Sequence, residues 1–140
     1  MKQQRLTIVG LGVSDLAISN HFYEHKFGWT KLPSSNENIT FMQLNGILLS
    51  LYPKDKLAED AGVSAEGSGF NSFTLAYNTH SKEEVDEIFA DLDQKGVTIV
   101  KPPEEAFWGG YSGYVADPDG HLWEIAFNPY LPLDEAGNVE

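Results

Sequence analysis

Histidines and acids at short spacings are the residues of this sequence most able to do chemistry. His21-Phe-Tyr-Glu-His25 matches the H-x-x-E-H pattern, in which two imidazoles on one helix face bind zinc. Phe22 and Tyr23 are apolar anchors of the same helix, so we expect the two histidines on its outward side, with no clear third ligand. The pattern therefore predicts a solvated helix face, and a weak adventitious metal site is the alternative. His80 and His121 fall at loop or turn positions, which favours surface residues over catalytic bases.

Two further motifs imitate ligand-binding loops. Gly10-x-Gly12 follows a predicted strand and opens a helix, as a dinucleotide fingerprint requires, but Asp15 occupies the third glycine position. We therefore expect a bulged strand end that needs small residues. Asp117-x-Asp119-Gly120 resembles the start of a calcium loop, but strand residues follow where further oxygen ligands are needed. It predicts a β-turn instead.

Aromatic residues near the end of the chain are the positive signal for a binding site. Phe107, Trp108, Tyr111, Tyr114 and Trp123 lie in or beside two predicted strands, and glycines interrupt these strands. Glycine inside a strand marks a bend or a close approach by a ligand or another chain. Aromatic walls with a few polar groups form small-molecule pockets, but a core or a dimer interface explains the same residues equally well.

Hydrophobic periodicity predicts the elements that position these residues. Residues 5–13 are rich in β-branched side chains and predict a strand, after which Ser14 or Asp15 caps a helix that ends at Gly28. Three short strands are predicted next, at residues 29–32, 39–44 and 46–52. Asn45-Gly46 is a strong signal for a hairpin turn between the last two.

The same order of elements then repeats. Residues 53–69 are polar and acidic and predict a linker with about one turn of helix. Residues 70–77 predict a strand, and Ser81 and Glu84 fit a capping box for a helix that ends at Lys95-Gly96. Strands are predicted at residues 97–101, 110–116 and 121–127, with a turn at residues 117–120.

This order predicts an α+β fold of two βαβββ units, at residues 5–52 and 70–128, within one domain. One such unit cannot bury its sheet face alone, so we expect the two units to pack together. Residues 129–140 contain two prolines and several acids, and predict an extended or frayed tail.

Composition excludes several classes of protein. The 140 residues include 9 Lys and Arg against 21 Asp and Glu, a net charge of −12, and no cysteine. Nucleic acids and anionic membranes both require basic patches, so neither is expected as a partner. Without cysteine there is no disulfide and no thiolate metal site. No apolar run approaches the ~20 residues that span a bilayer, and a soluble cytoplasmic protein is the expectation.

Three stretches together resemble the glyoxalase/bleomycin-resistance/extradiol-dioxygenase superfamily, also called vicinal oxygen chelate. They are Gly12-Val-Ser-Asp-Leu16 with Phe22-Tyr23 and Phe27-Gly28, the capped helix running to Gly96-Val97, and Gly110-Tyr-x-x-Tyr-Val-Ala-Asp-Pro-Asp-Gly-His-Leu-Trp-Glu-Ile125. The resemblance covers about residues 5–128, and residues 117–124 are its most specific part. It implies that each βαβββ unit curls into a half-cup with its helices outside, and that two units enclose a site.

Metal-dependent members of that family place ligands on the first and last strands of each unit. The resemblance puts these four positions at Ile8, Ser50, Ser72 and Glu124. Ile8 cannot bind a metal, and neutral serine hydroxyls are poor ligands for a transition metal. No histidine occurs in residues 1–20 or 46–79, so a shift of register does not restore the usual ligands. We therefore expect no metal and no cofactor.

What remains is a metal-free cup with an apolar lining, a few hydroxyls and one acid. The expected ligand-binding residues are Ile8, Ser50, Tyr52, Ser72, Trp108, Tyr111, Leu122 and Glu124. A buried Glu124 must find a partner or raise its pKa, so it is also the candidate catalytic residue, as a general base.

The predicted function is binding of a small apolar or cationic organic molecule by a homodimer. Two alternatives stay open. One is a lyase or isomerase that uses Glu124 as general base, and the other is a metal-dependent glyoxalase or dioxygenase with unrecognised ligands.

Overall fold

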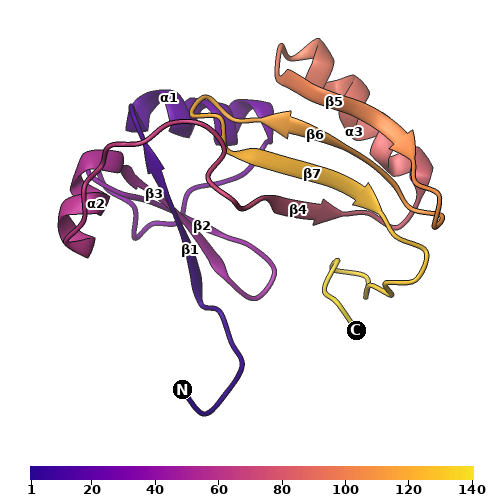
Figure 1. Ribbon diagram of the computed structural model, residues 1–140, viewed down its shortest axis with the longest axis horizontal. Helices are drawn as coiled ribbons and strands as arrows, with labels where there is room; N and C mark the ends of the chain where they lie inside the picture. Colours follow the sequence, from indigo (N-terminus) through magenta and orange to yellow (C-terminus); the bar gives the residue numbers. More distant parts are fainter. The chain divides into compact units, whose positions relative to one another are not determined.

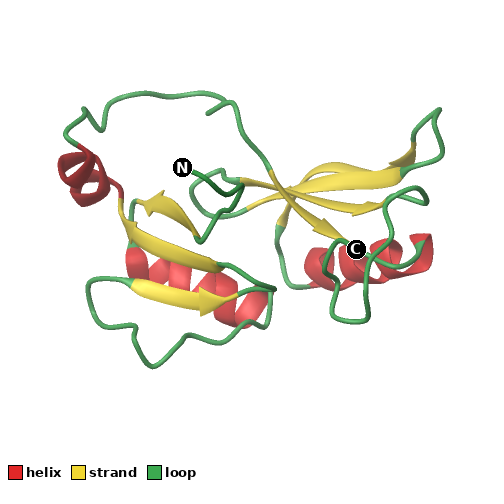
Figure 2. Ribbon diagram, turned by 90° about the horizontal axis from the view of Figure 1, so that it is seen from below, coloured by secondary structure: helices red, strands yellow, loops and turns green.

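The computed structural model describes all 140 residues and divides into two compact units, Met1–Gly69 and Phe70–Glu140 (Figure 1). Each unit is a sheet with a helix packed on one of its faces (Figure 2). The predicted α+β class is thereby confirmed. None of the helices has the length and apolar character that a bilayer-spanning segment needs.

The first unit contains a three-stranded sheet in the order β1-β3-β2. Strand β1 (Ile8–Val13) runs parallel to β3 (Leu48–Pro53), and β2 (Thr40–Gln43) runs antiparallel to β3. Helix α1 (Leu16–His21) begins at the N-cap Asp15 and continues as the π-helical turn η1 (Phe22–Lys26). Helix α2 (Lys54–Ala61) follows β3 directly.

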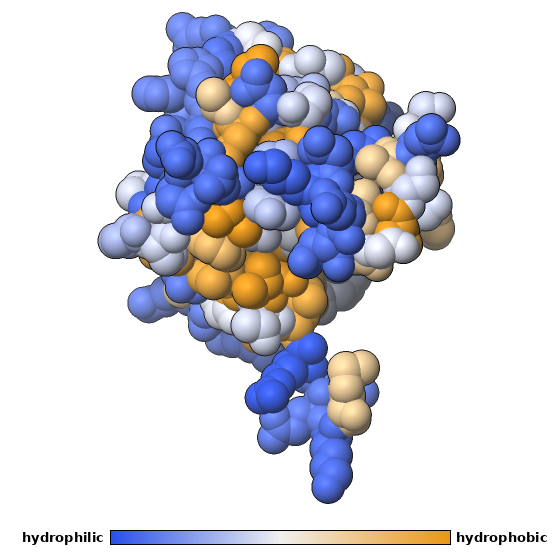
Figure 3. Space-filling model, turned by 90° about the vertical axis from the view of Figure 1, so that its left-hand side faces the viewer, coloured by the Kyte–Doolittle hydropathy of each residue, from blue (hydrophilic) through white to orange (hydrophobic).

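Strand alternation explains which face of this sheet is buried. The core combines one face of the three strands with the inner side of α1 and η1, and its members are Leu11, Val13, Ser19, Phe22, Tyr23, Thr40, Met42, Leu49 and Leu51. The side of the molecule that carries α1 and α2 is largely polar, with apolar residues in several places and their largest group below the centre of the view (Figure 3). The opposite face of the sheet carries the alternate residues of each strand.

Three expectations for the first unit are corrected by the structure. The strand expected at residues 29–32 is reduced to a single bridge between Lys31 and Met42, because the nearby Pro33 has no N–H to continue the ladder. The expected linker contains α2, about two turns of helix, which ends at Gly62 in the left-handed conformation (φ 73°). Strand β1 pairs with β3 without interruption, so Gly10 does not lie in a bulge.

The second unit contains a four-stranded sheet in the order β4-β7-β6-β5. Its strands are β4 (Leu75–Asn78), β5 (Thr98–Glu105), β6 (Tyr111–Ala116) and β7 (Leu122–Phe127). Only the β4–β7 pair is parallel. Helix α3 (Lys82–Gln94) covers one face, to which it presents the buried side chains of Val85, Phe89 and Leu92.

The capped start of α3 was predicted and is confirmed. The Ser81 hydroxyl accepts a hydrogen bond from the N–H of Glu84 at 3.1 Å. The Glu84 carboxylate reaches back to the N–H of His80, at 2.9 Å, one residue earlier than in a standard capping box.

Two strands of the second unit differ from expectation. Strand β4 begins at Leu75 instead of residue 70, because its parallel partner β7 begins only at Leu122, just after the turn at residues 117–120. Strand β5 continues to Glu105 through two prolines, which an edge strand with register shifts can accommodate.

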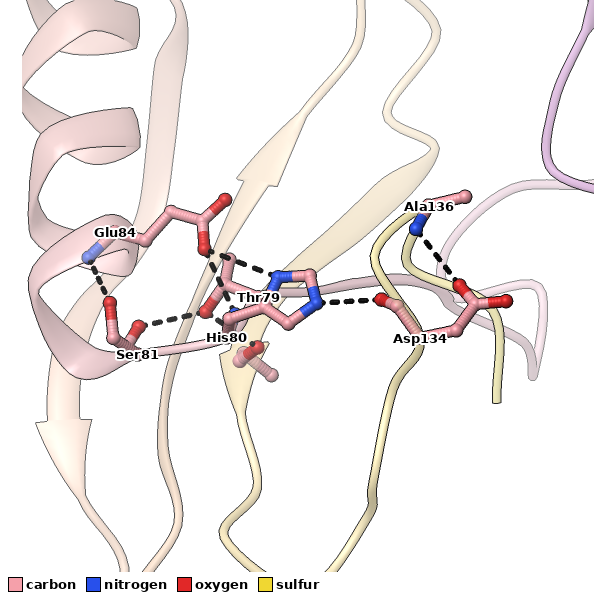
Figure 4. A network of polar contacts seen from close by, with 7 residues as sticks. Thr79, His80, Ser81, Glu84, Asp134 and Ala136 are labelled. Carbon is pink, nitrogen blue, oxygen red and sulfur yellow. Dashed lines mark hydrogen bonds and ion pairs between the residues drawn. The ribbon is translucent and has the colours of Figure 1, made fainter. Parts of the chain in front are cut away.

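The sequence predicted an extended or frayed C-terminal tail, and the structure corrects this expectation. Leu133 and Val139 form a bridge around a turn in which Asp134 Oδ1 accepts from the N–H groups of Ala136 and Asn138 at 2.9 and 2.8 Å. His80 Nε2 lies 2.8 Å from the carbonyl oxygen of Asp134 (Figure 4). The tail is therefore tied to the start of α3.

Candidate functional site

The candidate acid lies on the face of the second sheet opposite α3, which we call the open face. Side chains on the α3 side are identified by their contacts: the Tyr111 hydroxyl donates to Asp86 of α3 at 2.6 Å, and Gly113 lies beneath Phe89. The registers then place the other set on the open face: Ala76, Asn78, Thr98, Lys101, Glu104, Ser112, Tyr114, Ala116, Leu122, Glu124 and Ala126. Four of these residues are apolar, and the other seven carry polar or charged side chains.

Glu124 and Tyr114 are paired on this open face. They are direct neighbours in the β6–β7 register, and both are half-buried. Burial raises the pKa of Tyr114, and the charge of Glu124 and its hydrogen bond raise it further. The phenol therefore stays protonated, and the carboxylate beside it keeps its remaining lone pairs for another donor.

A cation lies next to this pair. Lys101 of β5 is in register with Tyr114, and its positive charge partly offsets the rise in the pKa of the phenol. The Lys101 ammonium pairs with Glu104 at 2.6 Å, and that hydrogen bond and charge raise the pKa of Lys101. The four groups place two carboxylates, one ammonium and one phenol on one sheet face.

This arrangement can act on a ligand in two ways. A half-buried carboxylate binds a cationic or N–H-bearing group by a charge-assisted hydrogen bond. The same carboxylate can take a proton as general base, with the neighbouring phenol as a hydrogen-bond donor to a developing negative charge.

The first unit places its predicted site residues on one face of its own sheet. Ile8, Ser50 and Tyr52 all point away from α1, since they alternate with the core residues of β1 and β3. Ile8 is 43% exposed, whereas Ser50 is only 8% exposed. A Cβ on Gly10, the register neighbour of Ser50, would lie 3.2 Å from the serine hydroxyl oxygen. Glycine at position 10 therefore leaves room for the hydroxyl of the buried Ser50.

The remaining predicted site residues are dispersed within the second unit. Leu122 lies on the open face with Glu124, but Tyr111 points to the opposite face. Ser72 precedes β4, in a bend with a φ of 64°, so it does not occupy the strand position expected for it. Trp108 lies in the β5–β6 turn, where its indole covers Gly110.

Two residues of the open face, Tyr114 and Lys101, were not among the predicted site residues. Tyr114 could not have been identified from the predicted turn at residues 117–120, because pairing outwards from those four residues brings it opposite Trp123, whereas the observed register is shifted by one residue and brings it opposite Glu124. Lys101 could not have been identified from the sequence either, because β5 pairs with Tyr114 only after a shift of its register with β6.

Comparisons with known proteins agree with this architecture. Residues 5–125 match the family model for the Glyoxalase/Bleomycin resistance protein/Dioxygenase superfamily. The chain therefore belongs to this superfamily, as the sequence motifs indicated.

Individual relatives cover nearly the whole chain. The crystal structure of a glyoxalase-related enzyme from Fulvimarina pelagi is 39% identical, with a TM-score of 0.88, and the match covers 99% of this chain and 98% of that one. The metallothiol transferase FosB of Lysinibacillus sphaericus (strain C3-41) is 31% identical over 126 residues, 89% of this chain and 83% of that protein. The uncharacterized protein YraH of Bacillus subtilis (strain 168) is 30% identical over 126 residues, 86% of this chain and 96% of its own length.

The side chains do not fit the metal site that metal-dependent members of the family carry. Among the four positions that the sequence resemblance assigned, only Glu124 has a good ligand atom for a transition metal, and Ser72 lies outside the strand expected for it. The β4 residue paired with Glu124 is Ala76, and the β1 residue paired with Ser50 is Gly10, so neither neighbour supplies a ligand. Within neither unit do three His, Asp or Glu side chains converge where they could hold a metal ion.

Proposed function

We propose that the protein binds a small organic molecule, apolar or cationic, and that Glu124 contacts its cationic or N–H-bearing group. The observation that carries this proposal is the placement of the half-buried Tyr114 and Glu124 directly opposite one another, on a face that also carries the apolar residues Ala76, Ala116, Leu122 and Ala126. A phenol and a carboxylate in contact present one donor and several acceptor sites to a ligand.

The remaining features of the chain support a cationic ligand over an anionic one. The net charge of −12 raises the concentration of cations near the surface. On the open face Lys101 is already paired with Glu104, so its charge is partly neutralised towards an incoming anion.

This binding requires no divalent metal, since the donor set at the four family positions is incomplete. A second candidate function is catalysis: a lyase or isomerase reaction with Glu124 as general base. The favouring observation is again the phenol beside the carboxylate, because a fixed donor next to a base can stabilise the charge that proton removal creates. The similarity to the glyoxalase-related enzyme of Fulvimarina pelagi supports this candidate too.

The test is a thermal-shift and calorimetric screen of metabolites and antibiotics, containing cationic aromatic compounds and neutral compounds of the same shape. A ligand of the native state raises its stability. We expect cationic hits, unaffected by a chelator. Glu124→Gln should fold normally and bind them more weakly by about 1.5–3 kcal/mol, which is the usual loss for a hydrogen bond to a charged group.

Glu104→Gln is the matched control, because Glu104 lies on the same face but is paired with Lys101. Equal losses in the two variants would argue for a general field effect and against a contact with Glu124. Turnover of a hit that Glu124→Gln abolishes would favour the lyase or isomerase function. Binding that requires an added metal would overturn the proposal.

A further inference from the structure

The outer side of the first unit's helix holds two histidines whose rings lie against one another. His21 is the last residue of α1 and His25 lies four residues further on, in η1. Their ring centroids are 4.5 Å apart with an angle of 35° between the planes, and both residues are exposed. The outward position expected from the sequence is what the structure shows, and it also brings the two rings together.

We propose that His21 and His25 form a binding site for one late divalent transition metal ion, such as Zn²⁺, Ni²⁺ or Cu²⁺. Imidazole nitrogens suit these ions, and two histidines at i and i+4 on one helix face are an established chelating arrangement. Two protein ligands are supplied, and water completes the coordination sphere. This site lies outside the four family positions, which are in the strands or, for Ser72, just before one.

The backbone that carries the two rings is held firmly in place. Phe22 and Tyr23, between the histidines in sequence, are 7% and 0% exposed and fix the helix to the sheet. Tyr23 also packs edge-on against Phe27 at 5.3 Å, and the Phe27 N–H bonds the carbonyl of Phe22 at 3.3 Å, which closes the π-helical turn. Since the two rings are already neighbours, a metal ion has little to order when it binds.

The charged side chains beside the pair supply no third protein ligand for the metal ion, since Lys26 follows His25 and the nearest acid is already paired. Glu24 precedes His25, but its carboxylate is paired with Lys31 at 3.5 Å. The overall charge of −12 attracts cations to the surface. Hard ions such as Mg²⁺ prefer oxygen ligands and would not select two imidazoles.

The test is a calorimetric titration of the full-length protein with Zn²⁺, repeated with Mg²⁺. We expect one saturable Zn²⁺ site per chain and no Mg²⁺ site. His21→Gln and His25→Gln should each weaken Zn²⁺ binding by about tenfold or more, because loss of one ligand removes the chelate effect. In NMR spectra, less than one equivalent of Zn²⁺ should shift the imidazole signals of His21 and His25 and leave those of His80 and His121 in place.

Two control variants distinguish this site from metal binding elsewhere on the protein. His80→Gln removes one exposed imidazole of the second unit and should leave the affinity unchanged. Glu124→Gln should also leave it unchanged, so the result does not depend on the proposed ligand site. The proposal would be overturned if Zn²⁺ binding were undiminished in both His21→Gln and His25→Gln, or if it were lost in Glu124→Gln alone. It would also be overturned if the native protein showed no saturable Zn²⁺ binding.

Discussion

Tyr114 and Glu124 lie directly opposite one another across the β6–β7 hairpin, half-buried on the sheet face that α3 leaves open. A second tyrosine of the same strand, Tyr111, donates to Asp86 on the opposite face. Each phenol thus has its own carboxylate, and alternation along β6 keeps the two pairs on separate faces.

These two pairs give a prediction on tyrosine titration. The pKa values of Tyr111 and Tyr114 are both raised, the first mainly by its hydrogen bond to Asp86 and the second mainly by burial and then by Glu124. Glu124→Gln should lower the pKa of Tyr114 part of the way and leave that of Tyr111 unchanged, and Asp86→Asn should do the reverse. NMR titration of the ring carbons measures both. A Tyr114 pKa that does not respond to Glu124→Gln would show that the two side chains are not in contact in solution.

Gly113 should be intolerant of a side chain. A Cβ there would lie 2.6 Å from the carbonyl oxygen of Lys101, 2.7 Å from the ring of Phe89 and 2.8 Å from the nitrogen of Pro103. Two of these neighbours are backbone, so Gly113→Ala should destabilise the fold by about 1–3 kcal/mol, the usual range for overpacking. Urea denaturation measures the loss. The control is Gly10→Ala, whose Cβ meets only the Ser50 side chain, at 3.2 Å; an equal loss there would contradict the argument.

The tail should loosen in acid. Hydrogen bonds from the Asn138 side chain and backbone hold the pKa of Asp134 below its ordinary value. Because the pKa of Asp134 is lower in the folded protein, its carboxylate stabilises the turn at pH values above the pKa of the unfolded state, about 3.9. This stabilisation is lost as the pH falls through the pKa of the folded state. Amide hydrogen exchange of residues 134–138 should therefore lose protection below about pH 4. Asp134→Ala should lose it at all pH values, whereas Glu135→Ala, in the same turn, should not.

We expect a symmetric homodimer in which the β5–β6 turn takes part. The sequence left a dimer interface open for the aromatic residues of this region, but Gly110 is covered by Trp108 and Tyr111 is bonded to α3. The exposed aromatic residues of this region are Phe107, at 103%, and Trp108, at 46%. Exposed apolar side chains of this size are typical of interaction sites, so Phe107→Ser should shift light-scattering mass towards the monomer. A native protein that is monomeric at tens of micromolar would refute this.

Local signals in the sequence were enough to identify most elements of the fold. An N-cap at Ser14 or Asp15, the cap at Ser81 and the turn at residues 117–120 were predicted, because each depends on side-chain and backbone preferences within a few residues, and the structure places the first cap at Asp15. Alternation correctly assigned Ile8, Ser50 and Tyr52 to one face and Leu122 and Glu124 to one face.

Long-range pairing decided the features that the sequence did not show. Residues 70–74 have strand-like composition but no partner, because β7 begins only at Leu122. The register shifts in β5 that bring Lys101 beside Tyr114 depend on contacts with β6 and not on local preference. The tail turn is held by a contact between His80 and Asp134, 54 residues apart.

The types of the residues in the candidate site could therefore be predicted from the sequence, but their spatial arrangement could not. The sequence by itself determined that one acid, Glu124, lies on an alternating strand and that the usual metal ligands are replaced. Only the tertiary structure decided that Tyr114, and not Tyr111, is the partner of that acid, and that His21 and His25 are in contact. A side chain's type is a local property, whereas its neighbours depend on strand register and helix geometry, which the packing of the whole unit sets.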